Sequence, residues 1–168
     1  MAFAAFLEAL AVIQLHVVAA FFAVALGPVA ILRRSRDIVH RAAGRAWVVS
    51  LAVTAGSSFW ITGMPMIGPF SVIHVLSVVT LVSLVSALRA VRSGDVARHG
   101  ATMRALYAQA LMLAGTFTFL PGRRMSEAVF PGTPWLGLAA MLAVAAAAVW
   151  LLWRDGRRNP LPFTGGLR

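Results

Sequence analysis

Residues 16–47 read HVVAAFFAVALGPVAILRRSRDIVHRAAGRAW, and residues 74–107 read HVLSVVTLVSLVSALRAVRSGDVARHGATMRALY. Each stretch begins with His-Val, continues through a long apolar run and enters an arginine-rich turn that contains Ser and Asp. A second histidine follows in each, then an arginine five residues later, and then an aromatic residue. The two stretches form an internal repeat, which predicts two similar helical hairpins in one chain.

The composition indicates a membrane protein. Of the 168 residues, 60% are hydrophobic and 12% are charged, and there is no cysteine. Soluble domains are about half apolar and about a quarter charged, so these values argue against a soluble globule and against a disordered chain. The absence of cysteine excludes a disulfide framework, Cys-ligated zinc, iron–sulfur clusters and covalent c-type haem. A small polytopic membrane protein of one domain remains.

The net charge of +10 comes from 15 basic residues, all of them arginine. They concentrate in three clusters, separated by apolar runs long enough to cross a bilayer. The clusters contain Arg33, Arg34, Arg36, Arg41 and Arg45, then Arg89, Arg92, Arg98 and Arg104, and finally Arg154, Arg157, Arg158 and Arg168. Arginine in alternate loops follows the positive-inside rule, so the charge indicates membrane orientation and not binding to nucleic acid.

The apolar runs predict an all-α polytopic membrane helical bundle. Five transmembrane spans are expected within a single domain of residues 1–158, followed by a cytoplasmic tail of residues 159–168. The spans are residues 5–32, 46–66, 70–90, 104–121 and 135–153. The two hairpins of the parallel repeat would form a four-helix core, with the fifth span packed outside it. The arginine clusters place the N-terminus outside and the C-terminus in the cytoplasm, as in a bacterial inner-membrane protein.

The four histidines of the chain fall into pairs. His40 follows His16 by 24 residues and His99 follows His74 by 25, so equivalent histidines are expected at equal depth. His16 and His74 would lie in the outer half of the bilayer, and His40 and His99 near the cytoplasmic face, roughly 20 Å away. Two imidazoles that face each other across a helix bundle form the axial ligand set of a b-type haem.

The histidines also fit roles that need no haem. A histidine within a span can bond a neighbouring helix, and interfacial histidine carries little energetic cost. Zinc fits less well, because each level offers two histidines and little carboxylate. A proton relay would leave the pairing by depth unexplained.

The pattern and depth of these histidines, over about residues 10–120, resemble those of the b561-type cytochromes and their bacterial four-helix relatives. The resemblance implies two haem b groups whose metal ligands are His16 with His74 and His40 with His99. It implies quinone chemistry, electron relay from a dehydrogenase partner, or superoxide oxidation at the outer face. The ascorbate-site motifs of the eukaryotic members are not evident, and the span after the ligand helices is a departure.

A second resemblance is closer in sequence. The stretch HRAAGR of residues 40–45, with Met103-Arg104 after His99, is similar to a family of small, functionally unassigned bacterial membrane proteins.

Several arginines are candidate partners of anionic haem propionates. Arg41, Arg45 and Arg104 flank the inner histidines, although membrane topology alone also accounts for them. Arg123 and Arg124 lie on the predicted outer side, against the charge rule. They would hold outer propionates or attract an anionic substrate such as superoxide, unless they belong to a solvated loop.

Four further positions allow two interpretations each. Asp37 and Asp95 would either orient the inner imidazoles or cap helices. Gln109 would contact a quinone or an imidazole, although packing between helices explains it better. Gly27 permits close approach of a macrocycle or a helix, and Gly27-Pro28 should weaken or kink the first span.

The sequence therefore predicts transmembrane electron transfer through two bis-histidine b haems. The expected partners are the lipid bilayer and a quinone or redox protein. Whether the chain is an oxidoreductase or a relay subunit stays open. The alternatives are a haem-free structural or assembly subunit of a larger complex and a small transporter.

Overall fold

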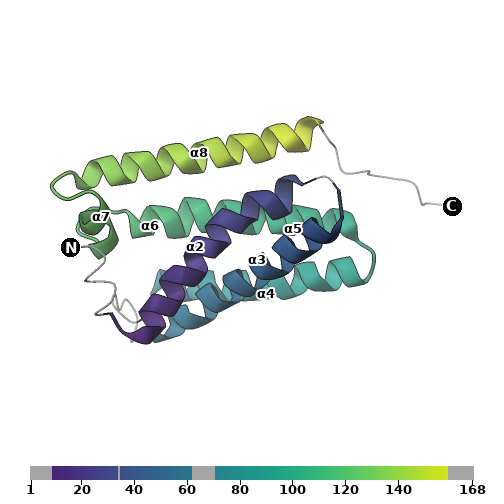
Figure 1. Ribbon diagram of the computed structural model, residues 1–168, viewed down its shortest axis with the longest axis horizontal. Coiled ribbons are helices and arrows are strands. Elements are labelled where there is room, and N and C mark those ends of the chain that lie inside the picture. Colours follow the sequence, from purple (N-terminus) through teal and green to yellow (C-terminus); the bar gives the residue numbers. More distant parts are fainter. Residues whose placement is uncertain (1–8, 34, 62–70, 159–168) are drawn as a thin grey trace.

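The computed structural model describes residues 9–33, 35–61 and 71–158, without the side chains of residues 111–113, 124 and 155–158, and every regular element in these ranges is helical (Figure 1). The long helices are α2 (Ala11–Leu32), α3 (Ile38–Ser57), α4 (Val72–Arg92), α5 (Val96–Gln109) and α8 (Pro134–Arg158). The short ones are η1 (Ser58–Trp60), the π-helix η2 (Ala110–Gly115), α6 (Thr116–Thr118) and α7 (Arg124–Val129). The predicted all-α class is confirmed.

Three helical segments are long and apolar enough to cross a membrane, among the residues that the structure describes: Ala11–Leu32, Val72–Arg92 and Pro134–Arg154. They correspond to the first, third and fifth expected spans. Arg41 and Arg45 make α3 less apolar, and α5 has only 14 residues before it continues into η2. Three of the five expected spans are thus supported, and the second and fourth stay predictions.

Helices α3 and α5 begin earlier than the apolar runs predicted, at Ile38 and Val96 and not at residues 46 and 104. An aspartate caps each start: Asp37 accepts a hydrogen bond from the backbone N–H of His40 at 3.0 Å, and Asp95 accepts one from that of Arg98 at 2.9 Å. These caps satisfy backbone donors that a first turn leaves unpaired, so the polar arginine-rich segments are helical.

Helix α2 passes through Gly27-Pro28 without ending there. Gly27 is buried against α5, and a Cβ at this position would lie 2.2 Å from Cε2 of Tyr107. The Tyr107 hydroxyl donates a hydrogen bond to the Val24 carbonyl at 3.2 Å. The glycine therefore allows an aromatic ring of α5 to lie directly on α2.

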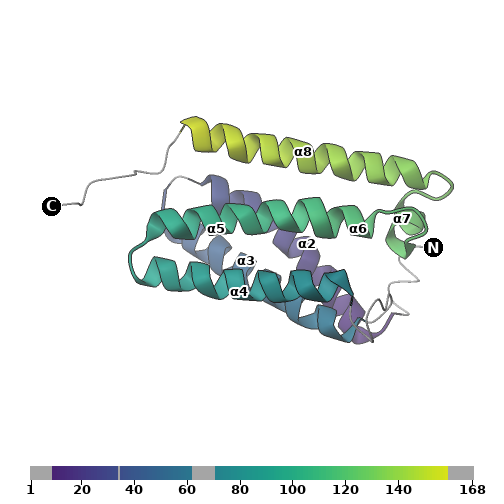
Figure 2. The same cartoon turned by 180° about the vertical axis from the view of Figure 1, so that it is seen from behind.

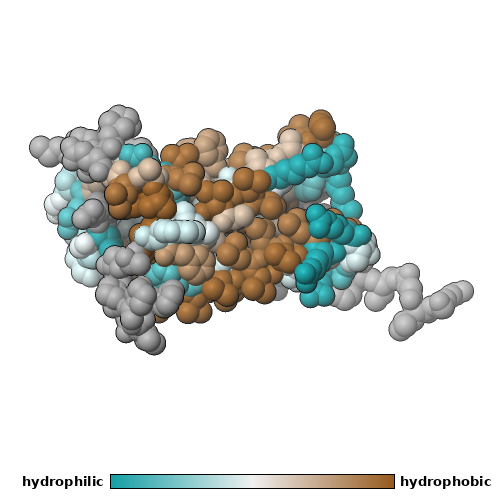
Figure 3. All heavy atoms as spheres, turned by 90° about the horizontal axis from the view of Figure 1, so that it is seen from below, coloured by the Kyte–Doolittle hydropathy of each residue, from teal (hydrophilic) through white to brown (hydrophobic). Residues whose placement is uncertain are grey.

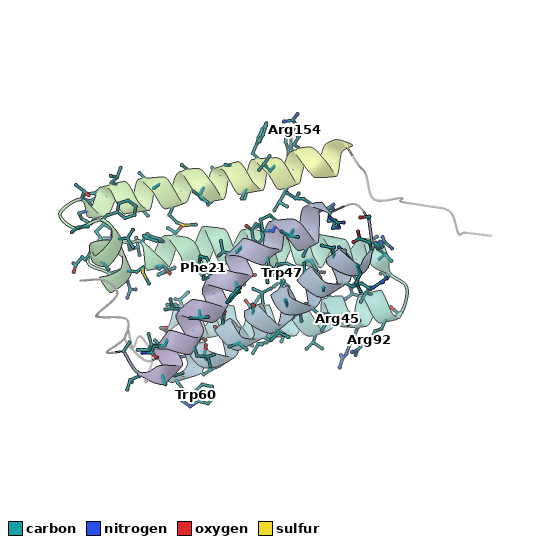
Figure 4. All side chains as sticks on the ribbon, viewed as in Figure 1. Phe21, Arg45, Trp47, Trp60, Arg92 and Arg154 are labelled. Carbon is teal, nitrogen blue, oxygen red and sulfur yellow. The ribbon has the colours of Figure 1, made fainter. Side chains whose placement is uncertain are left out.

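The chain runs up and down. Helices α2 and α3 pack against each other, as do α4 and α5, and further contacts join α3 to α4 and α2 to α5 (Figures 1 and 2). Helix α8 lies along α5, η2 and α6. The end of α2, the start of α3, the turn of residues 93–95 and the end of α8 share one end of the bundle, which we call the arginine-rich end (Figure 4). Helix α7 lies at the opposite end (Figure 1).

The surface agrees with a membrane environment. One face shows an apolar band over the middle of the bundle and hydrophilic residues at the arginine-rich end (Figure 3). The buried core is small and mostly aliphatic, with two aromatic residues. It contains Ala23, Ala30, Trp47, Leu51, Leu84, Ala87, Met103, Leu106, Tyr107 and Ala145.

Candidate functional site

A cavity of about 780 Å³ lies at the arginine-rich end, and both His40 and His99 line it. Its walls come from the last turn of α2, the first turns of α3 and α5, and α4. Each histidine lies one turn into its helix, behind the aspartate cap that starts the helix. The structure thus brings the predicted inner pair to one cavity.

The hydrogen bond of His99 determines which of its ring nitrogens carries the hydrogen. Its Nδ1 atom lies 3.0 Å from the carbonyl oxygen of Ala87, in the neighbouring helix α4. Because a carbonyl oxygen only accepts, Nδ1 must carry the hydrogen, and the lone pair of a neutral imidazole then lies on Nε2. Metal-ligating histidines commonly donate their other ring N–H to a backbone carbonyl in this way. In a neutral His99, the hydrogen bond to Ala87 therefore leaves the lone pair on Nε2.

His40 is less constrained. Its Nδ1 atom is buried and has no hydrogen-bond partner among the described residues. The carboxylate of Asp37 caps the backbone N–H of His40, and Asp95 likewise caps that of Arg98. Of the two interpretations of these aspartates, the structure shows the helix cap. A buried ring nitrogen without a partner costs about 1–3 kcal/mol.

Charge around the cavity is positive. The charged residues lining it, within the described part of the chain, are all arginines: Arg33, Arg36, Arg41, Arg45 and Arg104. They include the three arginines predicted beside the inner histidines and add two from the α2–α3 turn. Guanidinium groups suit carboxylate or phosphate ligands, so the cavity favours an anionic group at its mouth.

The carboxylate of Asp37 is paired with an arginine of this rim. Arg33 forms an ion pair with Asp37, and Ser35 also donates to this carboxylate. The Arg33 guanidinium, with the His40 backbone N–H, holds the pKa of the Asp37 carboxyl well below its usual range. Asp37 is therefore ionised at neutral pH and engaged outside the cavity.

Trp47 was not among the predicted site residues, yet it lines the same cavity. Its side chain is only 2% exposed, and its indole Nε1 is buried without a partner among the described residues. The indole N–H is thus a buried donor without an acceptor, in a residue whose side chain borders the cavity. The sequence signal was its place in the repeat, as the aromatic residue after His40.

The outer histidines have different surroundings. In α2, the Nδ1 atom of His16 lies 3.0 Å from the Ser57 hydroxyl oxygen at the end of α3. The Ser57 hydroxyl donates to the Val53 carbonyl at 2.6 Å, so it accepts from His16. His16 therefore carries its hydrogen on Nδ1, like His99.

His74 shows the opposite arrangement. It is buried, 4% exposed, and its Nδ1 atom accepts from the backbone N–H of Ser71 at 3.0 Å. A neutral His74 consequently carries its hydrogen on Nε2, which in this form offers no lone pair to a metal. Its ring packs against that of Phe59, with centroids 5.7 Å apart.

Serines at the end of α3 and the start of η1 join the helices near the outer histidines. Ser57 bonds His16, and the next residue, Ser58, shares a hydrogen bond of 2.6 Å with Ser77 of α4. Together with the protonation of His74, this geometry gives the outer pair less support as haem ligands than the inner pair. The proposed outer site stays a prediction.

The remaining predicted residues are separate from the cavity. Arg123 is the N-cap residue of α7, and Arg124 begins that helix, at the end opposite to the inner histidines. The side chain of Arg124 lies outside the described residues. Gln109 donates to the Thr80 hydroxyl at 3.1 Å, which is the packing contact between helices.

Two histidines per level do not form a metal site by themselves. Within the described ranges, no group of three or more His, Cys, Asp or Glu side chains could hold a metal ion. A pair of imidazoles suffices only where four other ligands come from a macrocycle, as in a bis-histidine haem. Two imidazoles at the inner cavity are thus too few ligands for a bare metal ion.

Comparison with known proteins gives a family. No curated protein and no solved structure matches the chain. A family model described as "Predicted membrane protein (DUF2306)" matches residues 13–153, which include all four histidines. The chain therefore belongs to this family of predicted membrane proteins, whose function is unknown.

Proposed function

We propose that this protein is a membrane cytochrome of the b type that relays electrons, with a haem held between His40 and His99. The observation that carries the proposal is that both histidines line one cavity of about 780 Å³ while the Ala87 carbonyl leaves Nε2 of His99 available as a ligand. Bound haem b would supply the one-electron iron couple, and the protein would supply ligation, orientation and a positive environment.

The arginines of the cavity have a distinct role in this proposal. Arg41, Arg45 and Arg104 would donate hydrogen bonds to the propionate carboxylates, which need cationic partners near the membrane surface. A positive environment also favours the reduced, more negative state of a redox centre.

The proposal includes a second haem, held between His16 and His74. Binding of this haem requires His74 to change its tautomer. Ligation by Nε2 of His74 requires its hydrogen to move to Nδ1, which then no longer accepts from the Ser71 N–H. The outer site should therefore bind haem more weakly than the inner site.

The contacts between helices support a more detailed arrangement of the chain in the membrane. Helices α2 to α5 would form the ligand-bearing core, with α8 outside it, in a bilayer whose cytoplasmic face meets the arginine-rich end. The N-terminus would then lie outside a bacterial inner membrane. A quinone, a redox protein or superoxide would exchange single electrons with the haem.

Spectroscopy of the purified full-length chain tests the proposal. We expect sharp haem b bands after reduction with dithionite, and an iron content of one to two per chain. His40→Ala and His99→Ala should each lose the inner haem. His16→Ala is the matched control, because it should retain the inner haem while removing a ligand of the outer one.

Two results would contradict the proposal. The first is protein that stays colourless after reconstitution with haem, while its circular dichroism shows a folded helical chain. That result would favour the haem-free subunit or the transporter. The second is retention of all haem by His99→Ala, which would contradict the ligand assignment.

A further inference from the structure

A second hollow of about 640 Å³ lies on the α4–α5 hairpin and shares no lining residue with the cavity of His40 and His99. One part of it is polar, with Ser86, Arg89 and Arg98, and the other part is apolar, with Val82 and Val85. We call it the hairpin groove. A site with a cationic end and an apolar end matches an amphiphile that has an anionic head.

The cationic end of the hairpin groove is built across two helices. The Arg98 guanidinium of α5 donates to the Ser86 hydroxyl of α4 at 3.3 Å, and Arg89 of α4 is exposed beside it. The acid of the groove, Asp95, accepts the backbone N–H of Arg98 at 2.9 Å as a helix cap. Two guanidinium groups and one capping carboxylate therefore line this end of the groove, which keeps a net positive charge.

The apolar end continues into the exposed face of α4. Val75, Val78, Val82 and Val85 follow one another at helical spacing, and Arg89 continues the same stripe. Val75 is 65% exposed and Val82 is 63% exposed, as expected for side chains that face lipid. From Val75 to Val85 the helix rises about 15 Å, which is half of a hydrocarbon core of about 30 Å. The stripe thus has the length of one leaflet.

We propose that the hairpin groove binds an anionic phospholipid of the leaflet at the arginine-rich end. Arg89 and Arg98 hold the phosphate, and an acyl chain lies along Val82 and Val85. Phosphatidylglycerol fits because its headgroup adds no cation, whereas the choline of phosphatidylcholine brings a positive charge towards the guanidinium groups. This inference does not depend on haem binding.

Native mass spectrometry of the purified full-length protein tests the site. Palmitoyl-oleoyl phosphatidylglycerol and palmitoyl-oleoyl phosphatidylcholine are titrated separately, and inorganic phosphate is added as a competitor. We expect phosphatidylglycerol to bind at least fivefold more tightly. Arg89→Gln or Arg98→Gln should weaken it by about fivefold each, as expected for one arginine near an anionic headgroup.

Arg92→Gln is the matched control, because Arg92 is an exposed arginine at the same end of α4 and does not line the groove. It should leave the affinity unchanged. Val82→Trp provides a charge-neutral variant that fills the apolar part and should also weaken binding. All variants are compared at equal helicity by circular dichroism.

Three results would overturn the proposal. Equal affinity for the two lipids would remove the anionic preference. An equal loss in Arg92→Gln and Arg98→Gln would indicate diffuse charge and no site. Competition by inorganic phosphate at concentrations as low as those of the lipid would assign the arginines to a free anion.

Discussion

The indole ring of Trp47 in α3 and the phenol ring of Tyr107 in α5 meet edge to face, with ring centroids 6.2 Å apart and planes inclined by 67°. The two residues hold equivalent places in the internal repeat, as the aromatic that follows each inner histidine and its arginine. Both are buried. The two copies of the repeat therefore contact each other directly in the core through these aromatic residues. The contact lies next to the cavity that His40 and His99 line.

Gly27→Ala should destabilise the protein, because the new Cβ would lie 2.2 Å from Cε2 of the Tyr107 ring. Overpacking of this kind costs about 1–3 kcal/mol. Thermal unfolding in detergent measures the effect. Gly56→Ala is the control, since no atom of another residue would lie within 4 Å of a Cβ at this position, and it should be neutral or slightly stabilising.

A double-mutant cycle sharpens this prediction. In a Tyr107→Ala background the ring is absent, so Gly27→Ala should lose most of its cost. An undiminished cost in that background would mean that the glycine is needed for a reason other than the ring.

Tyr107→Phe keeps the ring against Gly27 and Trp47 but removes the hydroxyl that donates to the Val24 carbonyl. Hydrogen bonds between helices in membranes average about 0.6 kcal/mol, so the loss of stability should be of that order. Chemical unfolding of the two proteins measures the difference. A cost above about 2 kcal/mol would show that the hydroxyl has a further partner.

The histidine tautomers can be read from ¹⁵N NMR of the haem-free protein at neutral pH. His16 and His99 should carry hydrogen on Nδ1, because their partners are the Ser57 hydroxyl, which is already donating, and the Ala87 carbonyl. His74 should carry it on Nε2, because its Nδ1 accepts from a backbone N–H. A hydrogen on Nδ1 of His74 would contradict the assignment.

Ser57→Ala extends the tautomer test by removing the hydroxyl acceptor of His16. The preference for the Nδ1–H form of His16 should weaken, with the Thr54 backbone left as its hydrogen-bond partner. Ser50→Ala is the matched control, because the Ser50 hydroxyl bonds only the Ala46 carbonyl of its own helix in the described structure. The control should leave the His16 signals unchanged.

The ion pair between Arg33 and Asp37 should give the α2–α3 turn an acid-sensitive contribution to stability. Arg33 lowers the pKa of the Asp37 carboxyl in the folded protein. The contribution is therefore present above the unfolded aspartate pKa of about 3.9, and it is lost as the pH falls through the lower folded value.

Arg33→Gln should raise the pKa of Asp37 towards the unperturbed value, as an NMR titration of the carboxyl would show. Arg36→Gln is the control, because Arg36 is not among the described partners of this carboxylate. An unchanged Asp37 pKa in Arg33→Gln would assign its low value to the backbone N–H of His40.

The site was partly predictable. The repeat gave His40 and His99 equivalent places in the sequence. Asp37 and Asp95 begin the two helices, so each histidine lies in a first turn. The similar depth of the two histidines along the bundle therefore followed from their spacing. Trp47 was missed, because an aromatic residue near a predicted interface is ordinary. Its unpaired indole N–H became visible only once neighbouring helices had enclosed it.

The helical class, the repeat and the gathering of arginine at one end can all be read from the order of the residues, because apolar run length and alternating chain direction are local properties. Apolar run length does not give the starts of α3 and α5. Each helix begins at an aspartate cap, within a polar segment that precedes the apolar run. For His16 and His99, the packing of the helices establishes which ring nitrogen carries the hydrogen. The partners of His16 and His99 lie 41 and 12 residues away, and the rotation and contact of neighbouring helices choose them.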